Sequence, residues 1–189
     1  MSEKLKDYIE LFHSDRVFIP TKTINVSGDV DIDMYDKMLC NLHSLDSING
    51  EITIKLMTDG GSVSIARGIY DIIRGCKNRV NIICYGEVSS AGTIILQAAD
   101  KRVMSPNSKL MLHVGSEGIA SDHPRNVDRA YTQNRVDEKW IEDVYLPKIK
   151  EKKKRYTRNQ LKSMLTWDKS FDPKEALELG LIDEIGEIQ

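Results

Sequence analysis

The chain has 189 residues, and its 27 basic and 29 acidic side chains leave a formal net charge of -2. This length suits one well-buried core, so we expect a single domain over residues 1–189. The balanced charge gives no global field that would favour nucleic acid or an anionic membrane as a partner.

Membrane and secretory classes are also disfavoured. No apolar run approaches the roughly 20 residues that span a bilayer, and the start "MSEKLKDYIELFHSD" is too polar for a signal peptide. Cys40, Cys76 and Cys84 lack the paired short spacing of a zinc site or a disulfide framework, so we expect buried, reduced thiols. These features predict a cytoplasmic protein without a metal.

Predicted strands and helices alternate in the first half of the chain. Residues 16–20 and 22–28 have the character of extended segments, and apolar side chains recur with helical period after Asp31. "EITIKLM" alternates as a strand does, "TDGG" breaks it, and a second helix is predicted from the N-cap residue Ser62. The apolar positions of the two helices are Tyr35, Met38, Leu39, Leu42 and Leu45, then Val63, Ala66, Ile69, Tyr70 and Ile73.

The same unit then repeats. Strand "VNIICY" leads through a predicted turn, "GEVSS", into "AGTIILQAA", a helix apolar enough to be buried on all sides. "KRVMS", the turn "PNS" and "KLMLHV" supply two more strands. Strands that alternate with helices predict an α/β fold with a parallel-rich sheet and right-handed crossovers.

Beyond His113 a polar loop precedes a long charged helix over residues 126–154. Its narrow apolar stripe is typical of packing on a neighbouring chain, and Pro147 is expected to kink or end it. The stripe consists of Val136, Trp140, Val144 and Tyr145. The run "KIKEKKKR" is interpreted as a solvated face, not a nucleic-acid site.

Two short helices are predicted near the carboxyl end. Thr157 and Gln160 have the spacing of a capping box, which marks a helix start. A second helix start is indicated at Asp172 and Pro173, and Gly180 is suited to its end.

The stretch "YGEVSSAG" places Ser89 and Ser90 where a strand turns into a helix. A turn serine is usually an N-cap, but acyl transfer by serine also needs a nearby base, an acid that orients it and backbone amides for the oxyanion. His113 ends a strand and is the best candidate base. The weaker candidates, in polar or helical surroundings, are His13, His43 and His123.

Gly60 and Gly61 follow a strand, where a backbone without side chains can approach a ligand closely. No Gly-Lys-Ser/Thr follows them or occurs elsewhere, so this is not a phosphate loop. Taken alone, the pair is also a common strand-to-helix turn.

Three segments together resemble the signature regions of ClpP, the self-compartmentalising caseinolytic serine peptidase of the ClpP/crotonase superfamily. In order, they are "MTDGGSVSIARGIYDII", "GEVSSAGTIILQAADKRVMSPNSKLMLH" and "WDKSFDPKEALELGLID". The resemblance covers about residues 16–183 and implies a spiral of repeated ββα units. It also implies a protruding helical handle at about residues 114–155.

This resemblance implies a serine endopeptidase with a Ser-His-Asp triad. The Gly-x-x-x-Ser-x-Gly turn matches Gly86 to Gly92, which makes Ser90 the nucleophile and Ser89 a turn residue. His113 matches the family's base and Asp168 its acid, while Gly61 and Ala91 match the oxyanion-hole amides. No cofactor or metal is implied.

The family also implies partners. They are polypeptide substrates, further copies of the chain in a heptameric ring or stacked double ring, and a separate ATP-dependent unfoldase for folded substrates. Neither nucleic acid nor membrane is expected. A ring is expected more firmly than a double ring, because Pro147 and the lysine run are atypical of the handle.

Two further departures from the family pattern carry expectations. Few residues precede the segment that matches the first helix, so we expect the family's axial gate to be missing or much reduced. Thr58 and Asp59 replace the usual Ser/Asn-Pro before the glycines, and this carboxylate beside the oxyanion hole is expected to weaken turnover.

The residues leave other functions open. A crotonase-type acyl-CoA hydratase or isomerase shares the implied core, although such proteins are generally longer and do not need the triad. A non-catalytic subunit of a mixed ring is another alternative, although such subunits typically lose triad residues. A serine-lysine membrane peptidase is disfavoured by His113 and by the missing span.

Overall fold

The structure is a computed structural model that describes residues 3–115 and 124–186. The strands are β1 (Val17–Phe18), β2 (Thr23–Ser27), β3 (Ile52–Thr58), β4 (Val80–Ser89), β5 (Lys101–Met104), β6 (Lys109–Leu112), β7 (Lys169–Phe171) and β8 (Glu184–Ile185). The α-helices are α1 (Glu3–Asp15), α2 (Ile32–Asp46), α3 (Val63–Gly75), α4 (Ala91–Gln97), α5 (Pro124–Lys152), α6 (Arg158–Leu165) and α7 (Pro173–Leu179).

The strands form one mixed sheet in the order β1-β2-β3-β4-β5-β8. Along this order the neighbours from β2 to β8 are parallel, and the short β1 at the edge pairs antiparallel with β2. β6 pairs in parallel with the end of β4, and β7 pairs antiparallel with β6. The predicted parallel-rich α/β sheet is therefore confirmed.

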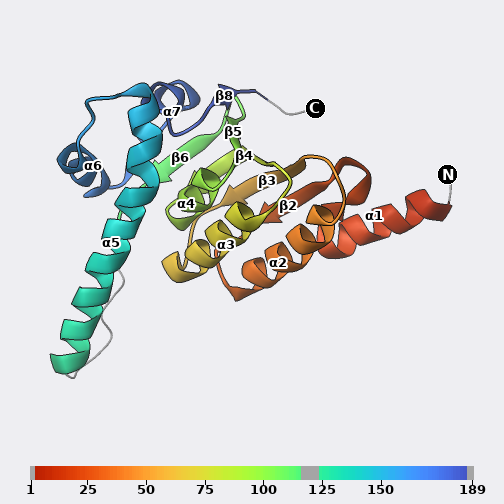
Figure 1. Cartoon of the computed structure of the whole chain (residues 1–189), viewed down its shortest axis with the longest axis horizontal. Coiled ribbons are helices and arrows are strands. Elements are labelled where there is room, and N and C mark those ends of the chain that lie inside the picture. Colours follow the sequence, from red (N-terminus) through yellow and green to blue (C-terminus); the bar gives the residue numbers. More distant parts are fainter. Residues whose placement is uncertain (1–2, 116–123, 187–189) are drawn as a thin grey trace.

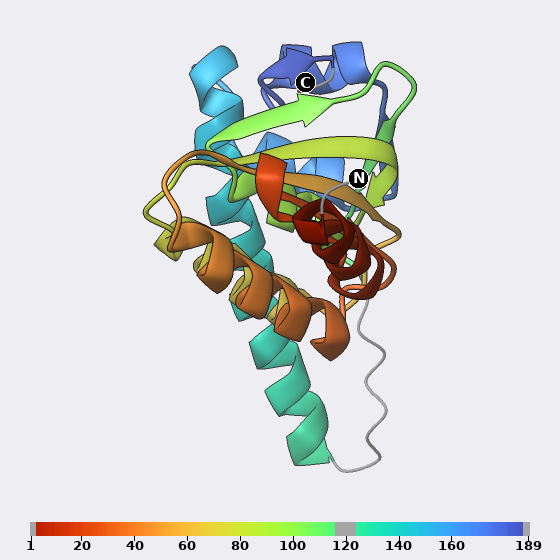
Figure 2. The same cartoon turned by 90° about the vertical axis from the view of Figure 1, so that its right-hand side faces the viewer.

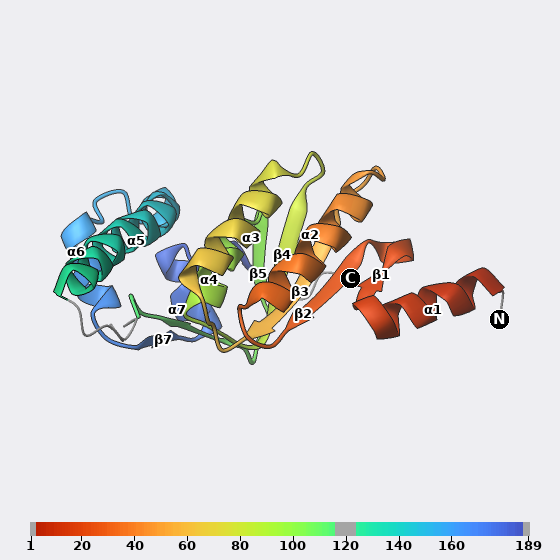
Figure 3. The same cartoon turned by 90° about the horizontal axis from the view of Figure 1, so that it is seen from below.

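Helices α2, α3 and α4 lie side by side over one face of the sheet (Figures 1 and 2). Helix α4 is buried along its whole length, as its apolar sequence predicts. Seen from below, α1 projects from one end of the molecule while α5 and α6 lie at the other (Figure 3).

The cysteines were predicted to be buried. Cys84 is buried, but the prediction was wrong for Cys40, because that thiol is on the exposed side of α2.

Side-chain caps fix the helix starts that the sequence indicated. Asp31 accepts a hydrogen bond from the Met34 amide at the start of α2, and Ser62 accepts one from the Ile65 amide at the start of α3. The predicted capping box that opens α6 has its two reciprocal bonds, and the predicted start of α7 has a capping box as well.

Strand β4 differs from its prediction, because the segment expected as the turn "GEVSS" is mostly strand. Gly86 has a positive φ of 60°, and the pairing of β4 with β3 shifts register there. A bulge of this kind bends a strand without ending it. Residues 87–89 then pair with β6, so the chain turns only at Ser90.

The predicted long charged helix is present as α5, but it does not end at Pro147. It continues through Pro147 to Lys152, because residues beyond the proline, including the fully buried Ile149, pack against the core. Val144 and Tyr145 are 8% and 2% exposed within their own chain, so the expected packing of these two on a neighbour was wrong.

The outer part of α5 leaves the body of the protein (Figures 1 and 2). Val136 is exposed there, whereas Trp140 packs edge-on against Tyr70 of α3. Within residues 3–115 and 124–186, no helix is both long and apolar enough to cross a membrane.

Candidate active site

Ser90 lies at the junction of β4 and α4 in an unusual backbone conformation, with φ 51° and ψ -124°. A non-glycine residue pays a steric cost for positive φ, so the surroundings must hold it in place. Its amide donates to the Met111 carbonyl of β6 at 2.7 Å. Its carbonyl accepts from the Thr93 amide at 2.9 Å and from Thr93 Oγ1 at 2.6 Å.

Two strand pairings bring a histidine and an aspartate to this serine. In the parallel pairing of β4 with β6, Ser89 lies opposite Met111, so the chain leaves both strands on the same side. In the antiparallel pairing of β6 with β7, Leu112 lies opposite Lys169, which places His113 beside Asp168. Three segments distant in sequence therefore meet at one corner of the sheet.

The three side chains form a continuous hydrogen-bonded row. His113 Nε2 is 2.7 Å from Ser90 Oγ, and His113 Nδ1 is 2.8 Å from Asp168 Oδ1. A neutral imidazole whose Nδ1–H donates to the carboxylate leaves Nε2 free to accept the serine proton. This geometry has the order that nucleophilic catalysis by serine requires.

The two ends of this row differ in exposure. The Asp168 side chain is 74% exposed, whereas that of His113 is 27% exposed. Because water screens an exposed charge, this contact is suited to orienting the imidazole ring more than to stabilising a charge on it.

The Gly60–Gly61 segment abuts the serine. A Cβ on Gly60 would lie 2.7 Å from Ser90 Cβ and 3.3 Å from the Ala91 amide nitrogen. A Cβ on Gly61, whose φ is 147°, would lie 2.6 Å from the Val30 carbonyl oxygen. Only glycine fits this close approach, which brings the glycine backbone next to the start of α4.

Val30 fixes the glycine segment from the other side. Its amide donates to the Gly60 carbonyl at 2.8 Å, and its carbonyl accepts from the Ser62 amide at 2.9 Å. Gly61, Ser90 and His113 line one cavity of about 260 Å³. Of the other two residues predicted from the resemblance, Ala91 directly follows Ser90 and Asp168 is hydrogen-bonded to His113, but neither lines this cavity.

The other candidates lie elsewhere. Ser89 donates its hydroxyl to Glu87 Oε1 at 2.9 Å instead of facing His113. His13 is exposed on α1 and His43 is exposed on α2, and neither lines the cavity. His123 lies outside the described residues.

A hydroxyl pair that supports the serine turn was missed from the sequence. Tyr145 Oη of α5 is 2.6 Å from Thr93 Oγ1, which itself donates to the Ser90 carbonyl, so the tyrosine is the donor of this pair. Burial raises the pKa of Tyr145 above its ordinary value, which keeps its proton in place. The only sequence signal was a tyrosine at the apolar stripe of a charged helix.

The cavity wall from α5 was also missed. Asn134, Asp137, Glu138 and Ile141 line it at positions i, i+3, i+4 and i+7 of the helix. This spacing places four side chains on one helix face, but the sequence alone does not show that the face points at Ser90.

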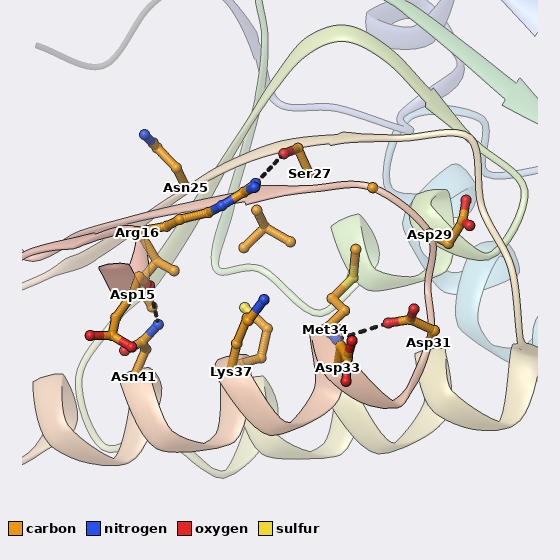
Figure 4. A pocket seen from close by; sticks show the side chains of 14 residues that line it. Asp15, Arg16, Asn25, Ser27, Asp29, Asp31, Asp33, Met34, Lys37 and Asn41 are labelled. Carbon is orange, nitrogen blue, oxygen red and sulfur yellow. Dashed lines mark hydrogen bonds between the residues drawn. The ribbon is translucent and has the colours of Figure 1, made fainter. Parts of the chain in front are cut away.

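A second cavity, of about 200 Å³, lies between β2 and α2 and contains none of the triad residues (Figure 4). Its carboxylates include Asp31, which caps α2, and its Arg16 donates to Ser27 Oγ. Among the described residues, no group of three or more His, Cys, Asp or Glu side chains could hold a metal ion.

Comparisons with known proteins agree with this architecture. A family model described as Clp protease matches residues 9–189. The chain is 32% identical over 168 residues to the ATP-dependent Clp protease proteolytic subunit of Deinococcus radiodurans, covering 87% of this chain and 79% of that protein. It is 28% identical over 188 residues to the chloroplastic proteolytic subunit 3 of Arabidopsis thaliana, covering 96% of this chain and 58% of that protein.

A solved structure of a ClpP1 mutant from Listeria monocytogenes superposes with a TM-score of 0.78 at 25% identity. The match covers 90% of this chain and 94% of the Listeria chain.

Proposed function

The chain belongs to the Clp protease family, and from this premise we propose that Ser90 is its nucleophile, His113 its general base and Asp168 the acid that orients the base. The chain is a serine-type endopeptidase that hydrolyses peptide bonds inside an oligomeric chamber. The observation that carries the residue assignment is the pair of contacts of 2.7 Å and 2.8 Å that join the three side chains.

Hydrolysis proceeds through an acyl-enzyme. His113 Nε2 takes the proton from Ser90 Oγ while the oxygen attacks the peptide carbonyl. The amides of Gly61 and Ala91 donate to the developing oxyanion. The imidazolium, steadied by Asp168, returns the proton to the leaving amine, and a water molecule activated by the same base then cleaves the ester.

The proposed substrates are short or unfolded polypeptides. The sequence contains no Walker-type phosphate loop, so the chain by itself has no recognised means of coupling ATP to unfolding. We therefore assign the unfolding of stable substrates to a separate ATP-dependent partner. The relative from Deinococcus is named as the proteolytic subunit of an ATP-dependent protease, which is consistent with this division.

For the assembly, we propose a ring of identical chains, each a single peptidase domain over residues 1–189 with its handle at about 114–155. The exposed Val136 on outer α5 is the proposed contact with another copy. We also propose a cytoplasmic location, which fits free cysteines at all three positions.

Fluorophosphonate labelling with intact mass and site mapping tests the nucleophile. Ser90→Ala is expected to abolish labelling and to reduce peptide turnover on the order of 10⁶-fold, because the triad acts as a unit. Ser89→Ala is the matched control and should keep much of both. A label that maps to Ser89 would contradict the assignment.

Asp168→Asn tests the acid. Loss of the group that orients His113 should reduce turnover by about 10⁴-fold in a chain that still folds and assembles. Parent turnover in a folded oligomer would identify another residue as the acid.

Light scattering coupled to size exclusion tests the assembly. We expect an oligomer for the parent chain and a smaller species for Val136→Glu, because the added charge would be buried at the proposed contact. A monomer that turns over peptide at full rate would refute the ring.

A further inference from the structure

The lining of the cavity beside Ser90 has an apolar part, called the floor below, and an acidic part, called the wall. Val63 and Val114 are half-buried and Ile141 is 2% exposed, so the floor can cover the methylene stem of a long side chain. The wall comes from α5, where Asp137 and Glu138 both line the cavity. No lysine or arginine is among the described residues that line it.

Asp137 is paired with Arg67, a cation that does not itself line the cavity. Its Oδ1 is 2.6 Å from Arg67 of α3 and 3.1 Å from Gln133 Nε2. The guanidinium of Arg67 is itself held 4.4 Å over the ring of Trp140. The negative charge of Asp137 is therefore largely compensated, and its position is set by the contact between α3 and α5.

Glu138 is not paired in this way, although Arg135 and Lys139 border it in a neighbouring surface hollow. It is exposed, and the described residues offer it neither an ion pair nor a hydrogen bond. Because those cations do not line the cavity itself, one paired and one unpaired carboxylate leave its lining with a net negative charge. A negative wall next to an apolar floor is complementary to a lysine or arginine side chain.

The cavity also has a defined relation to the scissile bond. Gly61, one of the two proposed oxyanion donors, lines it together with Ser90 and His113. The carbonyl that Ser90 attacks must therefore lie at the cavity mouth, and the side chain of the residue that bears this carbonyl is the one nearest to the cavity.

We propose that Glu138, supported by Asp137, makes this peptidase prefer substrates with lysine or arginine on the carbonyl side of the cleaved bond. This inference rests on the proposed function, because it takes Ser90 as the nucleophile. The expected preference is moderate, since Glu138 is exposed and an exposed charge is screened by water and salt.

Three fluorogenic peptides that differ only at that residue, carrying lysine, methionine or glutamate, test the proposal in the assembled protein. The parent is expected to cleave the lysine peptide about tenfold faster, in kcat/KM, than the methionine peptide, with the glutamate peptide slowest. Raising the salt concentration should narrow the differences, because screening weakens the attraction.

Variants that change the charge at residue 138 test whether Glu138 causes the preference for the lysine peptide. Glu138→Gln should lower the lysine-to-methionine ratio of kcat/KM by about three- to tenfold, and Glu138→Lys should invert the order of the lysine and glutamate peptides. Glu151→Gln is the matched control, since Glu151 is an exposed glutamate of the same helix outside the cavity. This control should keep the parent ratio.

Fluorophosphonate labelling distinguishes failure of the specificity proposal from failure of the proposed function. Where fluorophosphonate labels Ser90 and peptides are cleaved, equal rates for lysine and glutamate, or an unchanged ratio in Glu138→Gln, overturn the specificity alone. Absence of both labelling and cleavage in the assembled parent protein overturns the proposed function and the specificity with it.

Discussion

The inner and outer halves of α5 belong to one helix but are held by different forces. The inner half, from Ile141 to Lys152, buries Tyr145 and Ile149 in the core of its own chain. In the outer half, from residue 126 to Trp140, no described side chain is buried. The core therefore fixes the inner half, whereas the outer half is held to α3 by contacts at the surface such as the Arg67–Asp137 ion pair.

The largest expected contrast between the halves comes from removing a core side chain. Ile149→Ala should lower the free energy of unfolding by about 2–5 kcal/mol, because it removes buried methyl groups and leaves a cavity. Val136→Ala, the matched truncation in the exposed outer half, should change it by less than about 0.5 kcal/mol. Urea unfolding of the two variants under dissociating conditions measures this, and similar losses would mean that the halves are equally buried.

Alkaline unfolding sharpens the contrast at Tyr145. Burial raises the pKa of Tyr145, so above about pH 10 the unfolded chain releases this proton while the folded chain keeps it. The unfolded state then binds fewer protons, and stability falls as pH rises, by up to about 1.4 kcal/mol per pH unit.

The Tyr145→Phe variant should lack the part of the alkaline loss of stability that comes from the Tyr145 proton. Cys76, whose pKa burial raises to about 11, and Cys84 contribute in the same direction, so the difference between parent and variant is the quantity to measure. An identical pH dependence in both would show that the Tyr145 hydroxyl is solvated.

At neutral pH, Tyr145→Phe should cost about 1 kcal/mol, the usual net value of one hydrogen bond. It also removes the donor to Thr93 Oγ1, which helps to fix the Ser90 carbonyl, so we expect a several-fold fall in kcat. Thr93→Val should have the larger kinetic effect, because it removes the direct bond to that carbonyl. A normal kcat in both variants would show that the serine turn holds without this pair.

The smallest change in the free energy of unfolding is expected at Val136, in the outer half of α5. Val136→Ser should leave the stability of the isolated chain within about 0.5 kcal/mol of the parent, because the side chain is exposed. A loss above 1 kcal/mol that persists on dilution would place Val136 inside its own chain's packing.

Local signals allowed much of the fold to be predicted. The N-caps Asp31 and Ser62 and the two capping boxes act within one helical turn, so the sequence contains the whole interaction. The strand β3 could also be predicted, because its buried Ile52, Ile54 and Leu56 alternate with period two. The triad positions came from the family resemblance, and the structure places them at hydrogen-bond distance.

Features that depend on tertiary position could not be predicted. Val144 and Tyr145 fit packing on a partner as well as packing on the core, and only the path of α5 decides between them. The same applies to Glu138, because the sequence does not show which cavity its helix face meets. The bulge at Gly86 could not be predicted without knowing which strand β4 pairs with after it leaves β5.

The distance in sequence between His113 and Asp168, 55 residues, has a consequence for the newly made chain. At about 5–20 residues per second, a ribosome needs about 3–11 s to pass from the first to the second. During this interval β2 to β6 are already synthesised, whereas β7, which brings Asp168 to β6, is not. On the proposed assignment, a nascent chain in this interval has the serine and the histidine without the acid that orients them, and it cannot complete the triad before Asp168 has been translated.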